Sequence, residues 1–72
     1  MEKTLTCLND LCAFIKQERY EKHTSQSKLG EKTNLKQQYI NLIEKGRVAP
    51  RLDMVLKIVH ALDCELIIKK RG

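Results

Sequence analysis

The chain has 72 residues, which is enough for one small domain. Its formal net charge is +5, and after residue 35 it carries eight basic residues against four acidic ones. This imbalance favours an anionic partner for the second half of the chain. No apolar run approaches the ~20 residues of a membrane span, and the first residues lack the pattern of a signal peptide. We therefore expect a cytoplasmic protein with no membrane partner.

The cysteines and histidines do not form any metal-binding or disulfide pattern. Cys7, Cys12 and Cys64 are odd in number and lack a C-x-x-C pair, and His23 and His60 lie far apart. We expect reduced thiols, no metal and no cofactor. The chain also lacks a glycine-rich phosphate loop and is too short to shape a cleft of ~300 Å³ or more, so we expect neither an enzyme nor a small-molecule ligand.

The first apolar pattern has the spacing of one helix face and comprises Leu8, Leu11, Cys12 and Ile15. It predicts a helix that starts after an N-cap at Thr6 and ends near Arg19 or Tyr20. The polar residues 21–24 predict a turn.

Two short helices are predicted next. Ser25 is expected to cap a helix from Gln26 to about Lys32. Asn34 is expected to adopt a left-handed conformation in a tight turn. The second short helix should run from about Lys36 to Glu44, with Gly46 as a natural C-cap.

A longer apolar pattern from Leu52 to Leu62 predicts the last helix, and the alternation in Glu65–Lys69 predicts a strand. A lone strand leaves unpaired backbone groups, so pairing with a second copy across a two-fold axis is the simplest solution. Pairing with residues 3–7 and a disordered tail are the alternatives. The residues expected to form the dimer contact are Glu65, Leu66, Ile67 and Ile68.

Two short helices joined by a three-residue turn match the helix-turn-helix plan, in which the second helix enters the DNA major groove. The residues also resemble the phage-repressor (Xre/Cro) family in Ser25-Gln26-Ser27-Lys28-Leu29-Gly30 and in Ile40 with Ile43-Glu44-Lys45-Gly46. Gly30 stands where that family usually has Ala, and Asn34 where it usually has Gly. Both departures are expected to be mild, although a glycine within a helix costs about 1 kcal/mol relative to Ala.

The segment Leu52–Arg71 resembles the HipB-type antitoxins, whose dimers are joined by a C-terminal strand from each subunit. The resemblance implies a repressor of its own operon that binds double-stranded operator DNA and a HipA-like serine/threonine kinase toxin, or a split version of that kinase. The expected fold is all-α, with four to five short helices and one strand that pairs across a homodimer. Residues 1–62 would form the helical core of this single domain, and residues 63–72 the dimerisation strand and basic tail.

Long polar side chains at the start of the second short helix can reach base edges. The expected base-reading residues are Lys36, Gln37, Gln38 and Asn41. The expected phosphate-binding residues flank that helix and are Gln26, Ser27, Lys45, Arg47 and Arg51. The alternative is that these side chains are merely solvated. The resemblance further implies a partly buried ion pair between Arg19 and Glu44.

Two other functions remain open at this point. A phage-type repressor would bind DNA without a toxin partner, and a protein-interaction module would not bind DNA at all. A gel-shift assay on the DNA upstream of the protein's own gene separates the DNA-binding functions from the interaction module.

Overall fold

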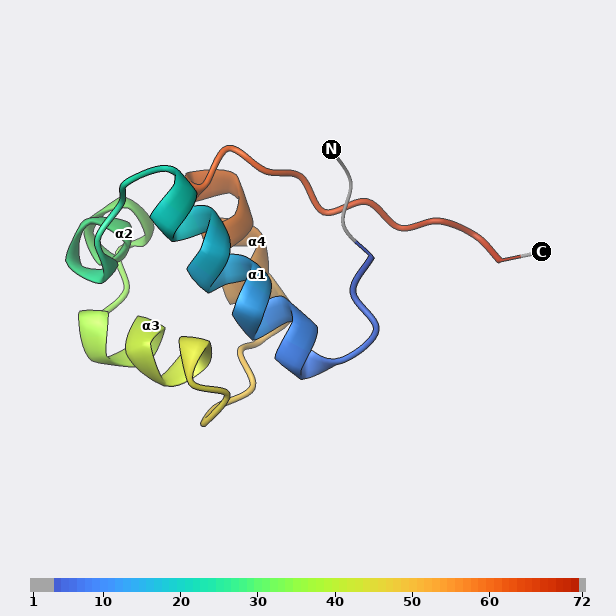
Figure 1. The fold of residues 1–72 in the computed structure, drawn as a ribbon, viewed down its shortest axis with the longest axis horizontal. Coiled ribbons are helices and arrows are strands. Elements are labelled where there is room, and N and C mark those ends of the chain that lie inside the picture. The colour runs from blue at the N-terminus through green and yellow to red at the C-terminus, as the bar shows by residue number, and fades with distance from the viewer. Residues whose placement is uncertain (1–3, 72) are drawn as a thin grey trace.

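Four helices build the computed structural model, which describes residues 4–71 (Figure 1). In chain order they are α1 (Leu8–Glu21), α2 (Gln26–Thr33), α3 (Gln37–Glu44) and α4 (Leu52–Ala61). Helix α2 packs on α3 and α4, and α1 packs on α3. The expected all-α helix-turn-helix fold is therefore confirmed.

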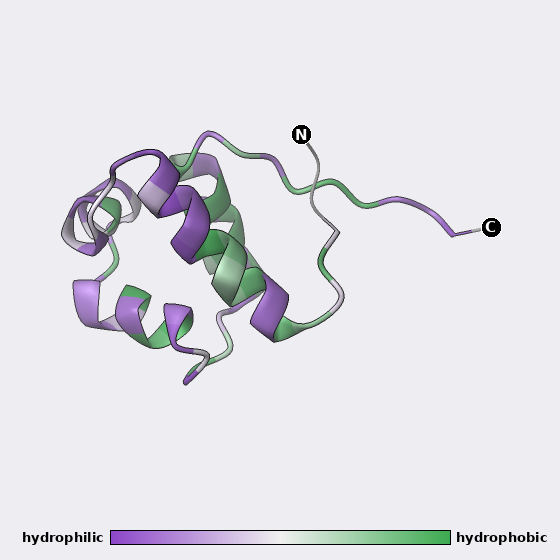
Figure 2. Cartoon of the chain, in the orientation of Figure 1, coloured by the Kyte–Doolittle hydropathy of each residue, from purple (hydrophilic) through white to green (hydrophobic). Residues whose placement is uncertain are grey.

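The core lies where the four helices meet. Its fully buried side chains are Ile15, Leu29, Ile40, Ile43, Ile58 and Leu62. Figure 2 shows α4 as a largely hydrophobic helix behind α1, whereas α1 and α3 carry hydrophilic residues on their outer sides. Burial of these aliphatic side chains supplies the main stabilising term, at about 1.5 to 3 kcal/mol for each fully buried one.

The predicted local signals around α2 and α3 are confirmed. The Ser25 hydroxyl accepts a hydrogen bond of 3.0 Å from the backbone N–H of Lys28, as an N-cap should. Asn34 has φ 59°, in the left-handed region, and ends α2. The chain leaves α3 at the expected place, although the C-cap residue is Lys45 and Gly46 is the residue after it. Gly46 has φ 71°, a conformation in which glycine avoids a side-chain clash.

Two expectations about helix starts are wrong. Cys7, not Thr6, is the N-cap of α1, because Thr6 lies one residue too early and both its backbone N–H and its hydroxyl donate to the Asp10 carboxylate, at 2.8 and 2.7 Å. Leu8 and Leu52 do not face the core, with 39% and 64% of their surfaces exposed. Both are the first residues of their helices, where the neighbouring helices do not cover them.

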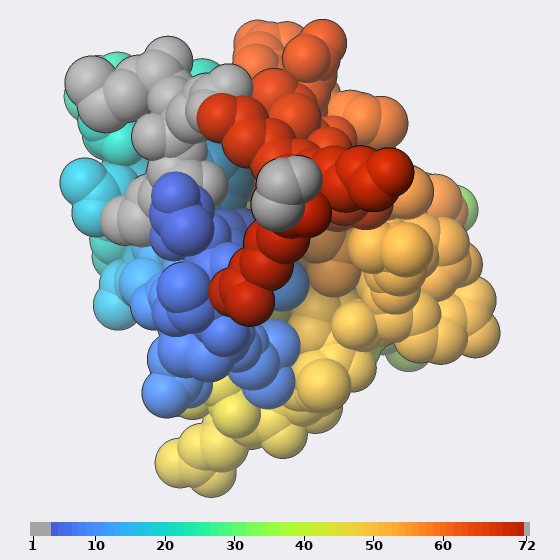
Figure 3. All heavy atoms as spheres, turned by 90° about the vertical axis from the view of Figure 1, so that its right-hand side faces the viewer, coloured from blue at the N-terminus to red at the C-terminus, as the bar shows by residue number. Residues whose placement is uncertain are grey.

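The expected strand is not formed in this single chain. Residues 64–71 have no regular secondary structure and extend away from the helices (Figure 1). Figure 3 looks at the end of the molecule toward which this tail extends, and α2 is almost hidden on the far side. A strand requires hydrogen bonds to a neighbouring strand. The alternative partner segment does not supply one, since residues 4–7 also have no strand structure and residue 3 lies outside the described residues.

Gly30 has a stronger structural role than its sequence context indicated. It is buried in α2, and a Cβ atom built there would lie 2.7 Å from the backbone carbonyl oxygen of Leu35. The N–H of Leu35 donates to the Gly30 carbonyl at 3.0 Å. The turn after α2 thus passes so close to position 30 that the structure requires glycine there.

Gly30→Ala should therefore destabilise the protein by about 1 to 2 kcal/mol. Alanine gains up to about 1 kcal/mol in helix propensity, but overpacking against a backbone atom costs about 1 to 3 kcal/mol, since the turn has to move. Thermal unfolding followed by circular dichroism measures the difference. A melting temperature equal to or above that of the wild type would show that the turn adapts without cost.

Candidate nucleic-acid interface

The turn between α2 and α3 sets the direction of α3. The left-handed Asn34 reverses the chain, Leu35 is half-buried beneath it, and Lys36 is the N-cap residue of α3. Because Ile40 and Ile43 are fully buried, the opposite side of α3 must face solvent. The turn and the core together present one polar face of α3 outward.

The outward face of α3 and the start of α2 line a shallow depression. Gln37 and Gln38 are exposed, and Asn41 and Gln26 are half-buried at its edge. The depression has a volume of about 430 Å³ and is also lined by Leu42. The expectation that the chain is too short to shape a hollow of ~300 Å³ or more is therefore wrong, because an open hollow between two packed helices does not need a long chain. Amide groups dominate this surface, and amides can both donate to and accept from base edges.

Leu42 is the residue of this surface that the sequence patterns did not reveal. It lies on the outer side of α3 and is 39% exposed. An apolar side chain on the polar face of an otherwise amphipathic helix was the available signal. Such a group suits contact with a thymine methyl group in the major groove.

Lys36 lies apart from the three other expected base-reading residues. It lines a second depression, of about 540 Å³, together with Tyr39 and Arg51. The first depression is lined by Gln37, Gln38 and Asn41 but not by Lys36. The structure thus brings Lys36 together with an expected phosphate-binding arginine rather than with the glutamines.

A buried ion pair holds α1 against α3. Arg19 Nε lies 2.7 Å from Glu44 Oε2, and Arg19 Nη2 lies 2.9 Å from Oε1, so the pair is bidentate. The side chains are only 7% and 3% exposed. Arg19 Nη1 also donates to the carbonyl of Thr24 at 3.0 Å. The hydrogen bond that the Arg19 guanidinium donates to Glu44 raises the pKa of Arg19, which keeps the guanidinium charged.

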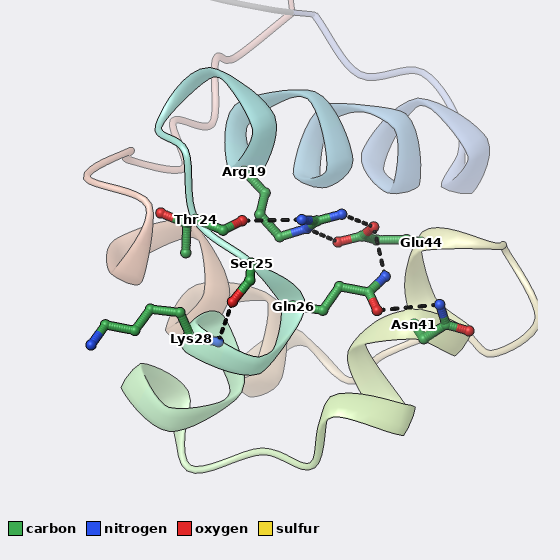
Figure 4. Close-up of polar contacts among 7 residues, drawn as sticks. All are labelled: Arg19, Thr24, Ser25, Gln26, Lys28, Asn41 and Glu44. Atoms are coloured by element: carbon green, nitrogen blue, oxygen red, sulfur yellow. Dashed lines mark hydrogen bonds and ion pairs between the residues drawn. The ribbon is translucent and has the colours of Figure 1, made fainter.

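The ion pair is connected to the candidate interface through hydrogen bonds. Gln26 Nε2 donates to Glu44 Oε1 at 3.1 Å, and Asn41 Nδ2 donates to Gln26 Oε1 at 3.3 Å (Figure 4). Gln26 was expected to bind phosphate and Asn41 to read a base. In this structure the two side chains bind each other.

The remaining expected phosphate-binding residues lie on the surface around α3. Ser27 is exposed in the first turn of α2, and Lys45 and Arg47 are exposed after α3. Arg51 is also exposed but forms a bidentate pair with Asp53, at 2.8 and 3.2 Å. That pair raises the pKa of Arg51 and lowers the pKa of Asp53. To contact a phosphate, Arg51 therefore has to give up one or both of its hydrogen bonds to the Asp53 carboxylate.

Residues 4–71 offer neither a metal cluster nor a membrane-spanning helix. No group of three or more His, Cys, Asp and Glu side chains that could hold a metal ion occurs within this range. Helices long and apolar enough to cross a membrane are likewise absent from it. Cys7, Cys12 and Cys64 are free thiols, and burial raises the pKa of the Cys12 thiol.

Comparisons with known proteins agree with this geometry. The helix-turn-helix family HTH_3 matches residues 15–68, which include all of α2, α3 and α4. Among solved structures, the complex of a HipB variant with an O2 20mer superposes with a TM-score of 0.87 over 100% of both chains, at 19% sequence identity. No curated protein sequence matches the chain.

Proposed function

Because the chain belongs to the HTH_3 helix-turn-helix family, which indicates a DNA-binding regulator, we propose that it is a sequence-specific repressor that acts as a HipB-like antitoxin. The observation that carries this proposal is the exposed amide face of α3, held in place by the turn at Asn34 and the buried Arg19–Glu44 pair. In the helix-turn-helix geometry such a face enters the major groove.

The base-reading role is proposed for Gln37, Gln38 and Asn41, with Lys36 nearer to the phosphates. A glutamine amide can bond bidentately to the N6 and N7 atoms of adenine. Lys36 shares its depression with Arg51, and positive side chains so close together favour the phosphate backbone over a single base edge. Ser27, Lys45 and Arg47 would complete the backbone contacts from either side of α3.

The dimer is proposed to form through the tail. Leu66, Ile67 and Ile68 are 37%, 56% and 89% exposed in the single chain, and Figure 2 shows a hydrophobic stretch in the extended tail. Pairing with the same segment of a second copy, with Glu65 at its start, would cover these side chains and satisfy the backbone groups. Two α3 helices spaced about 34 Å apart would then reach successive major grooves.

The proposed toxin partner is argued from the C-terminal segment of the chain and not from the DNA-binding face of α3. The resemblance of residues 52–71 to HipB-type antitoxins supports a HipA-like serine/threonine kinase, or its split form, as that partner. Co-purification of the protein with the product of the neighbouring gene tests this role. A kinase that binds the protein is the expected result, and a neighbouring gene of another class would leave a repressor without a toxin.

Base reading and backbone anchoring can be separated by substitution. Gln37→Ala or Gln38→Ala should weaken binding to the operator by about 1 to 3 kcal/mol and weaken binding to random DNA much less. Arg47→Ala should weaken binding to both DNAs alike. It should also flatten the slope of log affinity against log salt by about 0.9 per subunit, because one phosphate contact is lost.

The assay is a gel shift on the DNA upstream of the protein's own gene, run at several salt concentrations beside a random duplex. Lys57→Ala serves as a control, because Lys57 is an exposed cation of α4 that lines neither depression. If Gln37→Ala, Gln38→Ala and Arg47→Ala all weaken binding to the operator and to random DNA equally, α3 does not read the DNA sequence.

A further inference from the structure

The hydrogen bonds around Glu44 determine the direction in which two amide side chains face. An ionised carboxylate can only accept hydrogen bonds. Glu44 Oε1 accepts from Arg19 Nη2 at 2.9 Å and from the Gln26 amide at 3.1 Å. Gln26 must therefore turn its NH₂ group toward Glu44 and its carbonyl oxygen away from it.

The same constraint passes from Gln26 to Asn41. The Gln26 carbonyl oxygen faces Asn41 at 3.3 Å and can only accept, so Asn41 must turn its NH₂ group toward Gln26. A flipped Asn41 would place its carbonyl oxygen against that of Gln26. Figure 4 shows the outcome, with Asn41 Oδ1 on the side of the amide that points away from Gln26.

The free edge of Asn41 carries one acceptor and one donor. Asn41 Nδ2 has two hydrogens, and Gln26 takes only one of them. The other hydrogen and Oδ1 remain available at the rim of the α3 depression. An amide edge of this kind matches adenine, whose N6 donates and whose N7 accepts in the major groove.

We propose that Glu44 acts through Gln26 to hold the Asn41 amide in the one orientation that reads a single adenine in each half-site. Asn41 is then the specificity residue, and Gln26 and Glu44 are positioning residues. The ion pair that braces α1 against α3 thus also sets base preference. This inference rests on the proposed DNA-binding function, because Asn41 reads a base only if α3 enters the groove.

The hydrogen-bonded series Glu44, Gln26 and Asn41 has an energetic advantage, because the Asn41 amide loses its rotational freedom before the protein binds DNA. A free asparagine amide can present either of two orientations, and only one places Oδ1 opposite the N6 group of a given adenine. Gln26 removes the wrong orientation in the unbound protein, so binding does not have to select the right one. Without Gln26 the amide can accept other base edges, and the preference for adenine should fall.

The test compares Gln26→Met with the wild type on a selected duplex and on its single-base-pair variants. Methionine keeps the length of the side chain but removes both hydrogen bonds of this series. At one base pair in each half-site, we expect the preference for adenine to fall by about 5-fold or more, since a bidentate contact corresponds to roughly 5- to 150-fold. Preferences at all other positions should stay unchanged.

Two further variants separate positioning from general weakening. Ser27→Ala, the neighbouring residue in the first turn of α2, should lower affinity for all duplexes without changing any base preference. Asn41→Ala should abolish the preference at that base pair, and adding Gln26→Met to it should change nothing more there, as expected for residues that act in series. Gln26→Ala replaces Gln26→Met if the methionine variant does not fold.

The outcomes distinguish this inference from the proposed function. If the wild type does not discriminate among duplexes, the proposed function is wrong and the inference fails with it. If the wild type discriminates but Gln26→Met keeps the full preference at every base pair, the inference alone is wrong. A preference that Asn41→Ala leaves intact would also overturn it.

Discussion

Arg19→Met is expected to destabilise the protein by about 3 kcal/mol. The substitution removes the charge and both hydrogen bonds to Glu44 but keeps much of the side-chain length. Glu44 is only 3% exposed, so its carboxylate would remain buried without a cationic partner, and breaking a buried pair in this way costs about 3 to 5 kcal/mol. The Thr24 carbonyl would lose its hydrogen bond from Arg19 as well.

Thermal and urea unfolding measure this effect at one fixed protein concentration, because a dimer melts in a concentration-dependent way. A loss of 3 kcal/mol corresponds to a drop in melting temperature of about 12 to 24 °C for a domain of this size. Arg51→Met is the matched control. It removes the pair with Asp53, whose side chains are 76% and 59% exposed, and exposed pairs contribute at most about 1 kcal/mol.

Equal melting of the two variants would contradict the structural role given to Arg19. It would mean that Glu44 reaches water or another partner once Arg19 is gone. The comparison is direct because both variants replace an arginine by methionine.

Deletion of residues 64–72 is expected to convert a dimer into a monomer. The tail carries the exposed side chains of Leu66, Ile67 and Ile68. It starts beside the last turn of α1, where Cys64 contacts Glu18, and then extends past the helices on the side away from α2 (Figures 1 and 3). Its removal keeps all four helices and the six fully buried core side chains, and of the described residues 64–71 only Cys64 packs against that core. Analytical ultracentrifugation at micromolar concentration should give a dimer mass for the full chain and a monomer mass for the deletion.

The same deletion should weaken operator binding strongly. A dimer that holds two half-sites gains about 10²- to 10⁴-fold over a single domain through effective concentration. Deletion of residues 70–72 is the control, because it removes basic residues of the tail but keeps the apolar segment. An unchanged dimer mass after removal of 64–72, or a monomeric full-length protein, would refute pairing through the tail.

Much of the helical framework is readable from neighbouring residues. Ser25 as a cap, Asn34 in the left-handed turn and Gly46 after α3 all act through atoms within about four residues along the chain. The N-cap error at Thr6 was a local one of a single residue, whereas the errors about buried side chains arose where a local pattern had to compete with distant packing. Leu8 and Leu52 fit the apolar period of their helices, yet they lie at helix ends that the other helices do not cover.

In the candidate site, too, local spacing predicted some relations between residues and tertiary packing decided the others. Sequence spacing placed Gln37, Gln38 and Asn41 on one polar face, because helical periodicity alone sets that relation. It could not show that Lys36 lies beside Arg51, since those two residues are separated by the whole of α3 and the following loop. Such a relation depends on how α4 begins against α3.

By itself the sequence determined the four helical segments to within one or two residues, most of their apolar faces and the positions of the turns, because these properties depend on interactions between residues close in the chain. Only the tertiary structure decided that Gln26 links Glu44 to Asn41 and that Gly30 must remain without a side chain. Those contacts join atoms of separate elements at about 3 Å. Their existence depends on the packing of α1, α2 and α3 as a whole, which periodicity along one helix does not specify.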